Sequence, residues 1–229
     1  MRYPLKPIAL LLMLATTCTA FGAGGGQMPS QMPTQARESL TPEDQARNDY
    51  NAGVRLVEKA DQLSTDATHQ ADERKKTKAL SEADQAYAAA MKKFSHATEL
   101  QPSNYQAWNY IGYTNRKVGK YEAALAAYDH ALRLKPDYAE AIEYRGHAYL
   151  GLNRLADAKA AYLALFAGNR QLAATLLAAM QEWLGDHRGG VAGVDGATVE
   201  SFASWVSERS TIASQTASLT REGAVSAWH

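Results

Sequence analysis

The sequence has little cysteine and no excess of either charge. Only Cys18 occurs in 229 residues, which excludes a framework of internal disulfides and any metal site built from paired cysteines. The 24 Lys and Arg residues balance 24 Asp and Glu residues, so there is no basic field to hold nucleic acid. Val and Ile are scarce between residues 79 and 179, where alanine is frequent. This bias favours helices over strands and predicts an all-α protein.

Known catalytic signatures are also missing from the sequence. There is no HExxH, P-loop or GxSxG motif, and the glycines at 24–26 and 189–196 do not follow a strand, as a phosphate-binding loop would. His96 and His130 are 34 residues apart with no Cys, Asp or Glu at metal-ligand spacing. This favours solvated positions of a repeat over a metal site. We therefore expect no enzymatic activity, no cofactor and no metal.

A long apolar run is found only near the N-terminus, at residues 8–17. Arg2 and Lys6 precede it, and Cys18-Thr19-Ala20 follows as a small-x-small cleavage site. This pattern predicts a signal peptide over residues 1–20 and a periplasmic or secreted protein, most simply in a bacterium. The run is shorter than the roughly 20 apolar residues of a membrane span, which disfavours a retained anchor.

Cys18 has two alternative fates. Cleavage after Ala20 would remove it, whereas Ala15-Thr16-Thr17-Cys18 partly resembles the lipobox of bacterial lipoproteins. The motif departs at Ala15, where Leu is usual, and at Thr17, where Gly, Ala or Ser is usual. Lipidation of Cys18 would place the protein at the outer membrane, and only then do we expect contact with a membrane. The intact mass of the exported protein distinguishes the two fates.

An internal repeat of 34 residues follows. Small residues recur at Ala90, Ala124 and Ala158, and aromatic residues at Phe94, Tyr128 and Tyr162. Gly112 pairs in the same way with Gly146, and Pro102 with Pro136. The residues that we assign to packing of the repeats are Trp108, Gly112, Ala124, Tyr128, Ala131, Pro136, Gly146, Tyr149, Ala158 and Tyr162.

This pattern resembles the tetratricopeptide repeat (TPR) family, and in particular exported bacterial members. The resemblance implies pairs of antiparallel helices, which approach closely at the glycine and alanine positions and stack into a right-handed solenoid. We expect about three helix hairpins, a C-terminal capping helix and one further short helix. The predicted segments are a flexible N-terminal segment at 21–40, a TPR domain at 41–184 (repeats at 41–104, 105–138 and 139–170, cap at 171–184), a glycine-rich linker at 185–196, and a C-terminal helix that gives way to a polar tail at 210 within 197–229.

The first repeat carries an insertion. Gly53, the best candidate for its first-helix glycine, lies 37 residues before Ala90, whereas the equivalent pair in the second repeat is 12 residues apart. The 25 added residues, around 63–80, are polar and charged. They predict either two helices that are longer than usual or a disordered loop, and their charge favours the loop.

The family resemblance also implies where a partner would bind. In TPR proteins the first helix of each repeat lines a concave groove, and the corresponding positions here are Gln106, Asn109, Tyr113, Arg116, Lys117, Glu140, Glu143 and His147. The basic end of one helix meets the acidic start of the next, which suits a peptide of mixed charge. The resemblance therefore predicts a noncatalytic scaffold that binds a protein or peptide in the bacterial cell envelope.

Three alternatives stay open. A lipidated Cys18 would make the chain a lipid-anchored envelope assembly factor. Scattered His, Asp and Glu side chains could instead assemble into the site of a metal-handling or enzyme accessory protein, which elemental analysis would reveal. Self-association through Trp205 and the ends of the repeat stack is a third possibility, which light scattering would detect.

Overall fold

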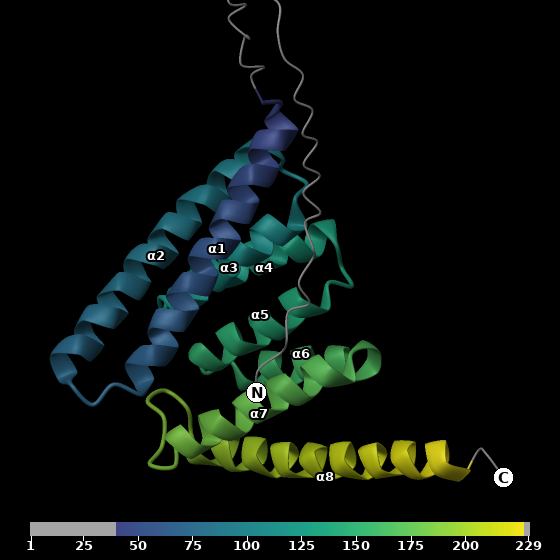
Figure 1. Ribbon diagram of the computed structural model, residues 1–229. Helices are drawn as coiled ribbons and strands as arrows, with labels where there is room; N and C mark the ends of the chain where they lie inside the picture. The colour runs from purple at the N-terminus through teal and green to yellow at the C-terminus, as the bar shows by residue number, and fades with distance from the viewer. Residues whose placement is uncertain (1–39, 227–229) are drawn as a thin grey trace, which may run out of the picture. The chain divides into compact units, whose positions relative to one another are not determined.

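The computed structural model describes residues 40–226, with side chains to residue 215, and within that range it contains α-helices and no strand (Figure 1). The predicted signal peptide, Cys18 and nearly all of the N-terminal segment lie outside the described residues. The helices are α1 (Pro42–Thr68), α2 (Glu73–Leu100), α3 (Tyr105–Lys117), α4 (Tyr121–Leu134), α5 (Ala139–Gly151), α6 (Leu155–Gly168), α7 (Arg170–Asp186) and α8 (Gly196–Ser226).

Three antiparallel hairpins stack in chain order. They are α1 with α2, α3 with α4, and α5 with α6, and each hairpin packs on the next. The first helices of the hairpins also contact one another, α1 with α3 and α3 with α5, whereas α7 packs on both α5 and α6. The turn of the second hairpin depends on Gly119, which has a φ of 75°, and Asn153 takes a φ of 57° at the equivalent turn. The predicted all-α solenoid of TPR hairpins is confirmed.

Glycine allows the two helices of a hairpin to approach closely. A Cβ atom on Gly112 would lie 2.4 Å from Cε1 of Tyr128, and one on Gly53 would lie 2.6 Å from Cε1 of Phe94. Gly146 differs, because a Cβ there would lie 2.5 Å from Cδ2 of Leu176 on α7, outside its own hairpin. The third glycine of the pattern therefore allows close approach of the capping helix α7, and not of the second helix of its own hairpin.

The packing residues of the repeat divide into two groups. Ala124, Tyr128, Ala131, Ala158 and Tyr162 are fully buried or nearly so. Trp108 and Tyr149, which we expected in the core, are only half-buried, and Pro136 is exposed. The Trp108 ring stacks on His130 with centroids 3.9 Å apart, and its Nε1 donates to the carbonyl of Pro102. His130 is therefore a packing partner at the surface, in contrast to the solvated residue that we expected.

The insertion in the first repeat is helical, so the loop interpretation of residues 63–80 is wrong. The chain leaves α1 after Thr68 and enters α2 at Glu73, and the Asp72 side chain caps α2 by accepting from the amides of Arg74 and Lys75. Buried alanines line the contact between the two long helices, at Ala60, Ala67, Ala83 and Ala86. Small side chains on both helices outweigh the charge content that favoured a loop.

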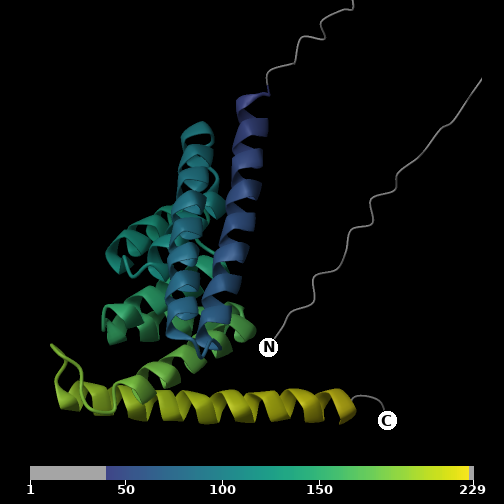
Figure 2. The ribbon, with the colours of Figure 1, turned by 60° about the vertical axis from the view of Figure 1, so that its left-hand side comes forward.

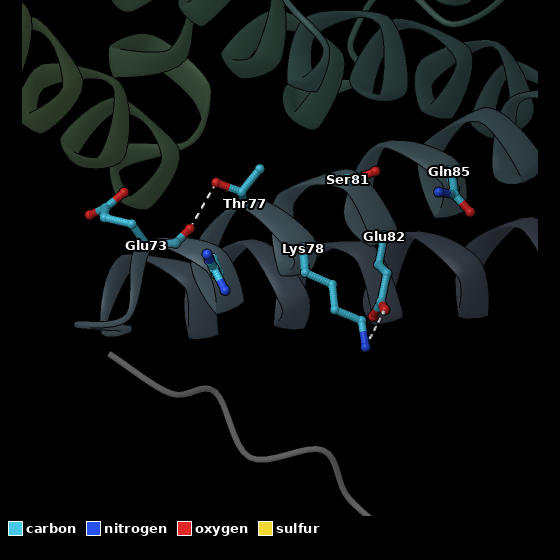
Figure 3. A pocket seen from close by; sticks show the side chains of 7 residues that line it. Glu73, Thr77, Lys78, Ser81, Glu82 and Gln85 are labelled. Atoms are coloured by element: carbon cyan, nitrogen blue, oxygen red, sulfur yellow. Dashed lines mark hydrogen bonds and ion pairs between the residues drawn. The ribbon is translucent and has the colours of Figure 1, made fainter.

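Added length in the first hairpin lies beyond its glycine contact. After Gly53, α1 continues for fifteen residues to Thr68, whereas α3 continues for only five residues after Gly112. At about 1.5 Å per residue this difference is about 15 Å of helix. A hollow of about 650 Å³ runs along the early part of α2 (Figure 3). Because all of its described lining residues belong to that one helix, it is a strip of helix surface and not an enclosed site.

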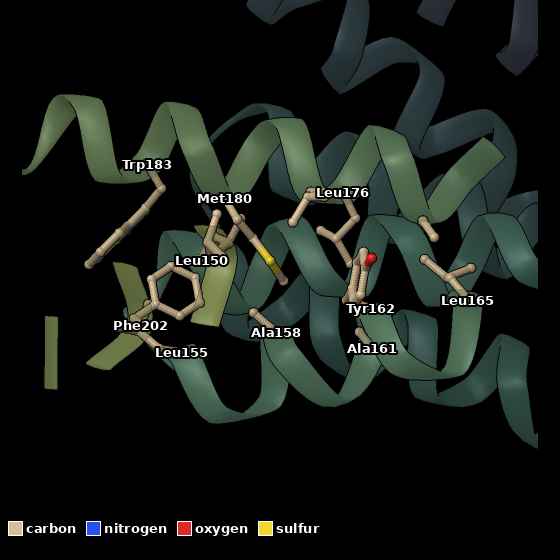
Figure 4. Packing of buried hydrophobic residues seen from close by; sticks show 13 residues of the cluster. Leu150, Leu155, Ala158, Ala161, Tyr162, Leu165, Leu176, Met180, Trp183 and Phe202 are labelled. Atoms are coloured by element: carbon tan, nitrogen blue, oxygen red, sulfur yellow. The ribbon is translucent and has the colours of Figure 1, made fainter. Parts of the chain in front are cut away.

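The C-terminal helices close the stack with an apolar cluster that joins α5, α6, α7 and α8 (Figure 4). α8 contributes Phe202 and Val206 to this cluster, and these side chains are 0% and 3% exposed. Trp205 packs on Tyr162 with ring centroids 5.3 Å apart. The ring that we considered for self-association therefore contacts the chain itself, and self-association stays a prediction.

Two expectations for the C-terminal segments are wrong. Residue 185 belongs to α7, so the glycine-rich connection is shorter than 185–196, and it contains an antiparallel bridge between Val191 and Val194. The polar tail expected from residue 210 is helical, because α8 continues to Ser226 (Figure 2). Asp195 starts α8 by accepting from the amide of Thr198 at 2.9 Å.

Candidate binding face

The candidate site is the face formed by the first helices α1, α3 and α5, which we call the first-helix face. Asn109, Tyr113 and Arg116 lie on one stripe of α3 at helical spacing, and this stripe is directed toward α5. The Tyr113 ring contacts the Tyr144 ring with centroids 5.1 Å apart. The Arg116 guanidinium lies 5.1 Å from the Tyr113 centroid and 5.5 Å from that of Tyr144. Tyr113, Arg116 and Tyr144 thus form a contact between α3 and α5.

Asp61 of α1 organises the α1 side of the face. It accepts hydrogen bonds from the hydroxyls of Tyr113, at 2.7 Å, and Tyr87, and it pairs with Nζ of Lys117 at 3.0 Å. Tyr113 and Lys117 were predicted to contact a partner, but the structure directs both to Asp61. Burial, followed by the negative charge of Asp61, raises the pKa of Tyr113. The hydroxyl therefore stays protonated and keeps donating to the carboxylate.

The remaining predicted residues separate by burial. Asn109 and Glu143 are only 2% and 3% exposed, so they line the floor of the face. Glu143 holds Nε2 of His147 at 2.6 Å from its Oε1, one helical turn away. Gln106 is half-buried and Glu140 is exposed, which leaves these two among the predicted residues most open to a partner.

Tyrosines dominate this face. Tyr50 of α1 contacts Tyr110 of α3 with ring centroids 5.8 Å apart, and Tyr110 contacts Tyr113 at 6.2 Å. Tyr138, the residue just before α5, contacts the Tyr105 ring with centroids 4.9 Å apart; burial, followed by the charges of Glu140 and of the Tyr50, Tyr110 and Tyr144 hydroxyls, raises its pKa. We call Tyr50, Tyr110, Tyr138 and Tyr144 the tyrosine cluster; each member is half-buried.

The tyrosine hydroxyls are available as donors. Burial, followed by the neighbouring hydroxyls, raises the pKa of Tyr50 to about 12, and burial followed by Glu143 raises the pKa of Tyr144 to about 12. Burial also raises the pKa values of Tyr110 and Tyr138. Within residues 40–215 none of these four hydroxyls makes a hydrogen bond with another described group. They can therefore donate to a ligand at neutral pH.

Two buried polar atoms on the same stripe of α3 also lack partners among the described residues. They are Oδ1 of Asn109 and Nε of Arg116. An unsatisfied buried polar atom costs about 1–3 kcal/mol, so such atoms are rare unless a water or a ligand satisfies them.

Sequence reasoning missed the tyrosine cluster and Asp61. Tyr110 and Tyr144 are 34 residues apart, so the repeat itself marks them as equivalent positions next to the predicted stripe. Asp61 lies on α1 just before the insertion, eight residues after Gly53, whereas α3 already ends five residues after Gly112. Its contact with Tyr113 joins residues that are 52 positions apart, which no local pattern indicates.

Other kinds of site are not found in the described part of the chain. Residues 40–215 bring together no group of three His, Cys, Asp or Glu side chains that could hold a metal ion. None of the described helices combines the length and the apolar character that crossing a membrane requires.

The stacked hairpins and their 34-residue period define a helical-repeat protein. A family model described as TPR repeat matches residues 116–153, from the end of α3 through α5. This part of the chain is therefore similar to a TPR repeat, a fold that is typically a noncatalytic module for protein interaction.

Solved TPR domains are similar to parts of the chain. The second TPR domain of human RPAP3, in complex with an HSP70 peptide, is 21% identical, with a TM-score of 0.45, and the match covers 60% of this chain and 95% of that domain. The first TPR domain of Spaghetti (RPAP3), bound to an HSP90 peptide, is 21% identical over 55% of this chain and 94% of that chain, with a TM-score of 0.38. The Arabidopsis OM64 TPR domain is 15% identical over 56% and 93%, with a TM-score of 0.40. None of the curated proteins matches the sequence.

Proposed function

We propose that the chain is a noncatalytic scaffold that binds a segment of a protein partner along the first-helix face. The observation that carries this proposal is the tyrosine cluster, whose four half-buried rings have hydroxyls that bond to no other described group. Tyrosine supplies a large apolar surface and a hydrogen-bond donor at little cost in conformational entropy, which makes it a frequent anchor at protein interfaces.

The stacked helices support binding of a chain segment without rearrangement. The α1–α3 side is held by the Asp61 contacts, and the α3–α5 side by the Tyr113–Tyr144 contact. A face that is already ordered costs little additional entropy when a partner binds. The TPR domains of RPAP3 named above bind peptides, and we extend this mode of recognition, without its specificity, to the present chain.

Site-specific photo-crosslinking tests this proposal. The reactive residue p-benzoylphenylalanine replaces Gln106 or Glu140 on the first-helix face and, as matched controls, the exposed Ala123 of α4 or Ala167 of α6. We expect the same partner to be captured in living cells from both face positions and from neither control position. Equal capture from all four positions, or capture from the controls alone, would contradict the proposal.

We also propose that this scaffold acts in the bacterial cell envelope. The support is the signal-peptide pattern at residues 1–20, which lies outside the described residues. Cell fractionation and the intact mass of the exported protein test this part separately. Cleavage after Ala20 is expected, and a mass that includes lipid on Cys18 would indicate the anchored form. A protein that stays in the cytoplasm at its full mass would contradict both forms.

A further inference from the structure

The charges around the tyrosine cluster are unequal. Four carboxylates belong to the helices of this face: Asp61 accepts from the Tyr113 hydroxyl, Glu58 lies three residues before Asp61 on α1, Glu140 follows Tyr138 at the start of α5, and Glu143 contacts His147. Three Arg or Lys side chains lie in the same region, namely Arg116, Lys117 and Lys135. The Asp, Glu, Arg and Lys side chains of the face therefore sum to a formal charge of −1, although the chain as a whole is neutral.

Internal contacts identify which carboxylates are free. Asp61 is neutralised by Lys117 at 3.0 Å, and Glu143 contacts His147 and lies near Arg116. Glu58 of α1 and Glu140 of α5 are both exposed, and neither forms an ion pair with a described residue. The two unpaired acids therefore belong to opposite outer helices of the face, with the tyrosine cluster contributed by α1, α3 and α5.

The resident cations show the chemistry that these rings accept. Arg116 lies over the Tyr113 and Tyr144 rings, and Lys117 lies 5.7 Å from the Tyr87 centroid and 5.8 Å from that of Tyr113. A guanidinium or ammonium group within about 6 Å of an aromatic face is attracted to it, and the attraction increases as water is excluded. Lys135 lies 6.0 Å from the Tyr138 centroid. The rings of Tyr50 and Tyr110 have no such cation among the described residues.

We propose that the occupant of the first-helix face is a cationic segment of a partner protein, with Arg or Lys side chains that contact the tyrosine cluster and pair with Glu58 and Glu140. This inference rests on the proposed function, because it specifies the chemistry of the partner at the same site. An acidic segment would meet two unpaired carboxylates and is disfavoured.

Selection from a display library of random peptides separates this inference from the proposed function. Peptides are first selected for binding to the full chain. Their binding to two double variants, which have the same change in charge, is then measured. The test variant is Glu58→Lys with Glu140→Lys, and the control is Glu99→Lys with Glu122→Lys, at exposed positions of the second helices α2 and α4.

We expect selected peptides enriched in Arg and Lys, with binding weakened about tenfold or more by the test variant and little changed by the control. Binding should also weaken between about 0.05 M and about 0.5 M salt, since the acids are solvent-exposed. Peptides that need the face but lack this enrichment, or bind the test variant better, would overturn the cationic inference and leave the proposed function intact. Peptides that bind equally after a Tyr110→Phe change combined with the test variant would overturn both.

Discussion

The two ends of the repeat stack are held together by different kinds of side chain. The α5–α8 end contains one large apolar cluster with Leu, Met, Trp and Phe side chains, to which α8 contributes Phe202 (Figure 4). The α1–α4 end contains three small clusters of alanine and aromatic residues, connected by tyrosine contacts and by Asp61. The comparison teaches that apolar burial stabilises one end, while the other keeps half-buried tyrosines and polar groups at its surface.

The largest effect on stability is expected at the C-terminal end. Phe202→Ala removes a fully buried ring from the α5–α8 cluster and should lower the free energy of unfolding by about 3–5 kcal/mol. Urea unfolding followed by helical circular dichroism measures this loss. The matched change at the other end is Tyr110→Phe, which keeps the ring stacked on Phe94 and removes a hydroxyl that has no described partner. Its effect should stay within about 0.5 kcal/mol; similar losses from both variants would remove the distinction between the ends.

A smaller effect on the free energy of unfolding is expected when a methyl group is added at the close helix contact of the second hairpin. Gly112→Ala places a Cβ 2.4 Å from Cε1 of the fully buried Tyr128, which must shift, at a cost of about 1–3 kcal/mol. Gly185→Ala is the control, because Gly185 lies in α7 with nothing within 4 Å of the added atom. There the better helix propensity of alanine should raise the free energy of unfolding by up to about 1 kcal/mol. Thermal unfolding of both variants checks the opposite signs, and a neutral Gly112→Ala would refute the close-approach argument.

The smallest effect concerns an ion pair of the first hairpin and depends on pH. Burial alone would raise the pKa of Asp49, but hydrogen bonds from Lys93 and His96 outweigh it and hold the pKa below the ordinary 3.8. A lowered folded-state pKa contributes stability above the unfolded value, and this is lost as the pH falls through the folded value. Because Lys93 and His96 are about half exposed, we expect only about 0.5–1 kcal/mol.

Unfolding of Asp49→Asn and of the unchanged protein at neutral pH and at about pH 3 measures this contribution. The difference between the two proteins should be present at neutral pH and shrink in acid. Glu99→Gln, at an exposed position with no described ion pair, controls for general charge effects. A difference that grows in acid would reverse the sign that we derive.

The sequence was sufficient to predict the hairpins, because packing within a repeat uses residues at fixed separations. The contact of Gly112 with Tyr128 recurs as that of Gly53 with Phe94, although the insertion displaces Gly53 from the period by 25 residues. The contact of Gly146 with Leu176 of α7 was not predictable in this way, since the capping helix does not follow the period. Its position depends on burial of the whole α5–α8 cluster, which is a property of the assembled fold.

The binding face was predicted less well than the fold. The stripe with Asn109 and Tyr113 was identified from the family resemblance, but burial of Asn109 and the pairing of Tyr113 with Asp61 depend on α1 and α5 together. The tyrosine cluster combines three helices and a turn, and the rings of Tyr50 and Tyr138 have no common spacing in the sequence. Such convergence arises only when separate hairpins are stacked.

The site of the insertion in the first hairpin also bears on how this chain can change in evolution. All of the added residues lie on the far side of the contact between Gly53 and Phe94, toward the turn at residues 69–72. Turns of helix gained or lost in facing pairs between the Asp61–Tyr87 contact and the turn alter the reach of the hairpin and leave that contact in place. The register of the repeats and the spacing of Tyr50 from Tyr110 stay the same. The tip of the first hairpin is thus a position where insertions and deletions can accumulate while the binding face is inherited unchanged.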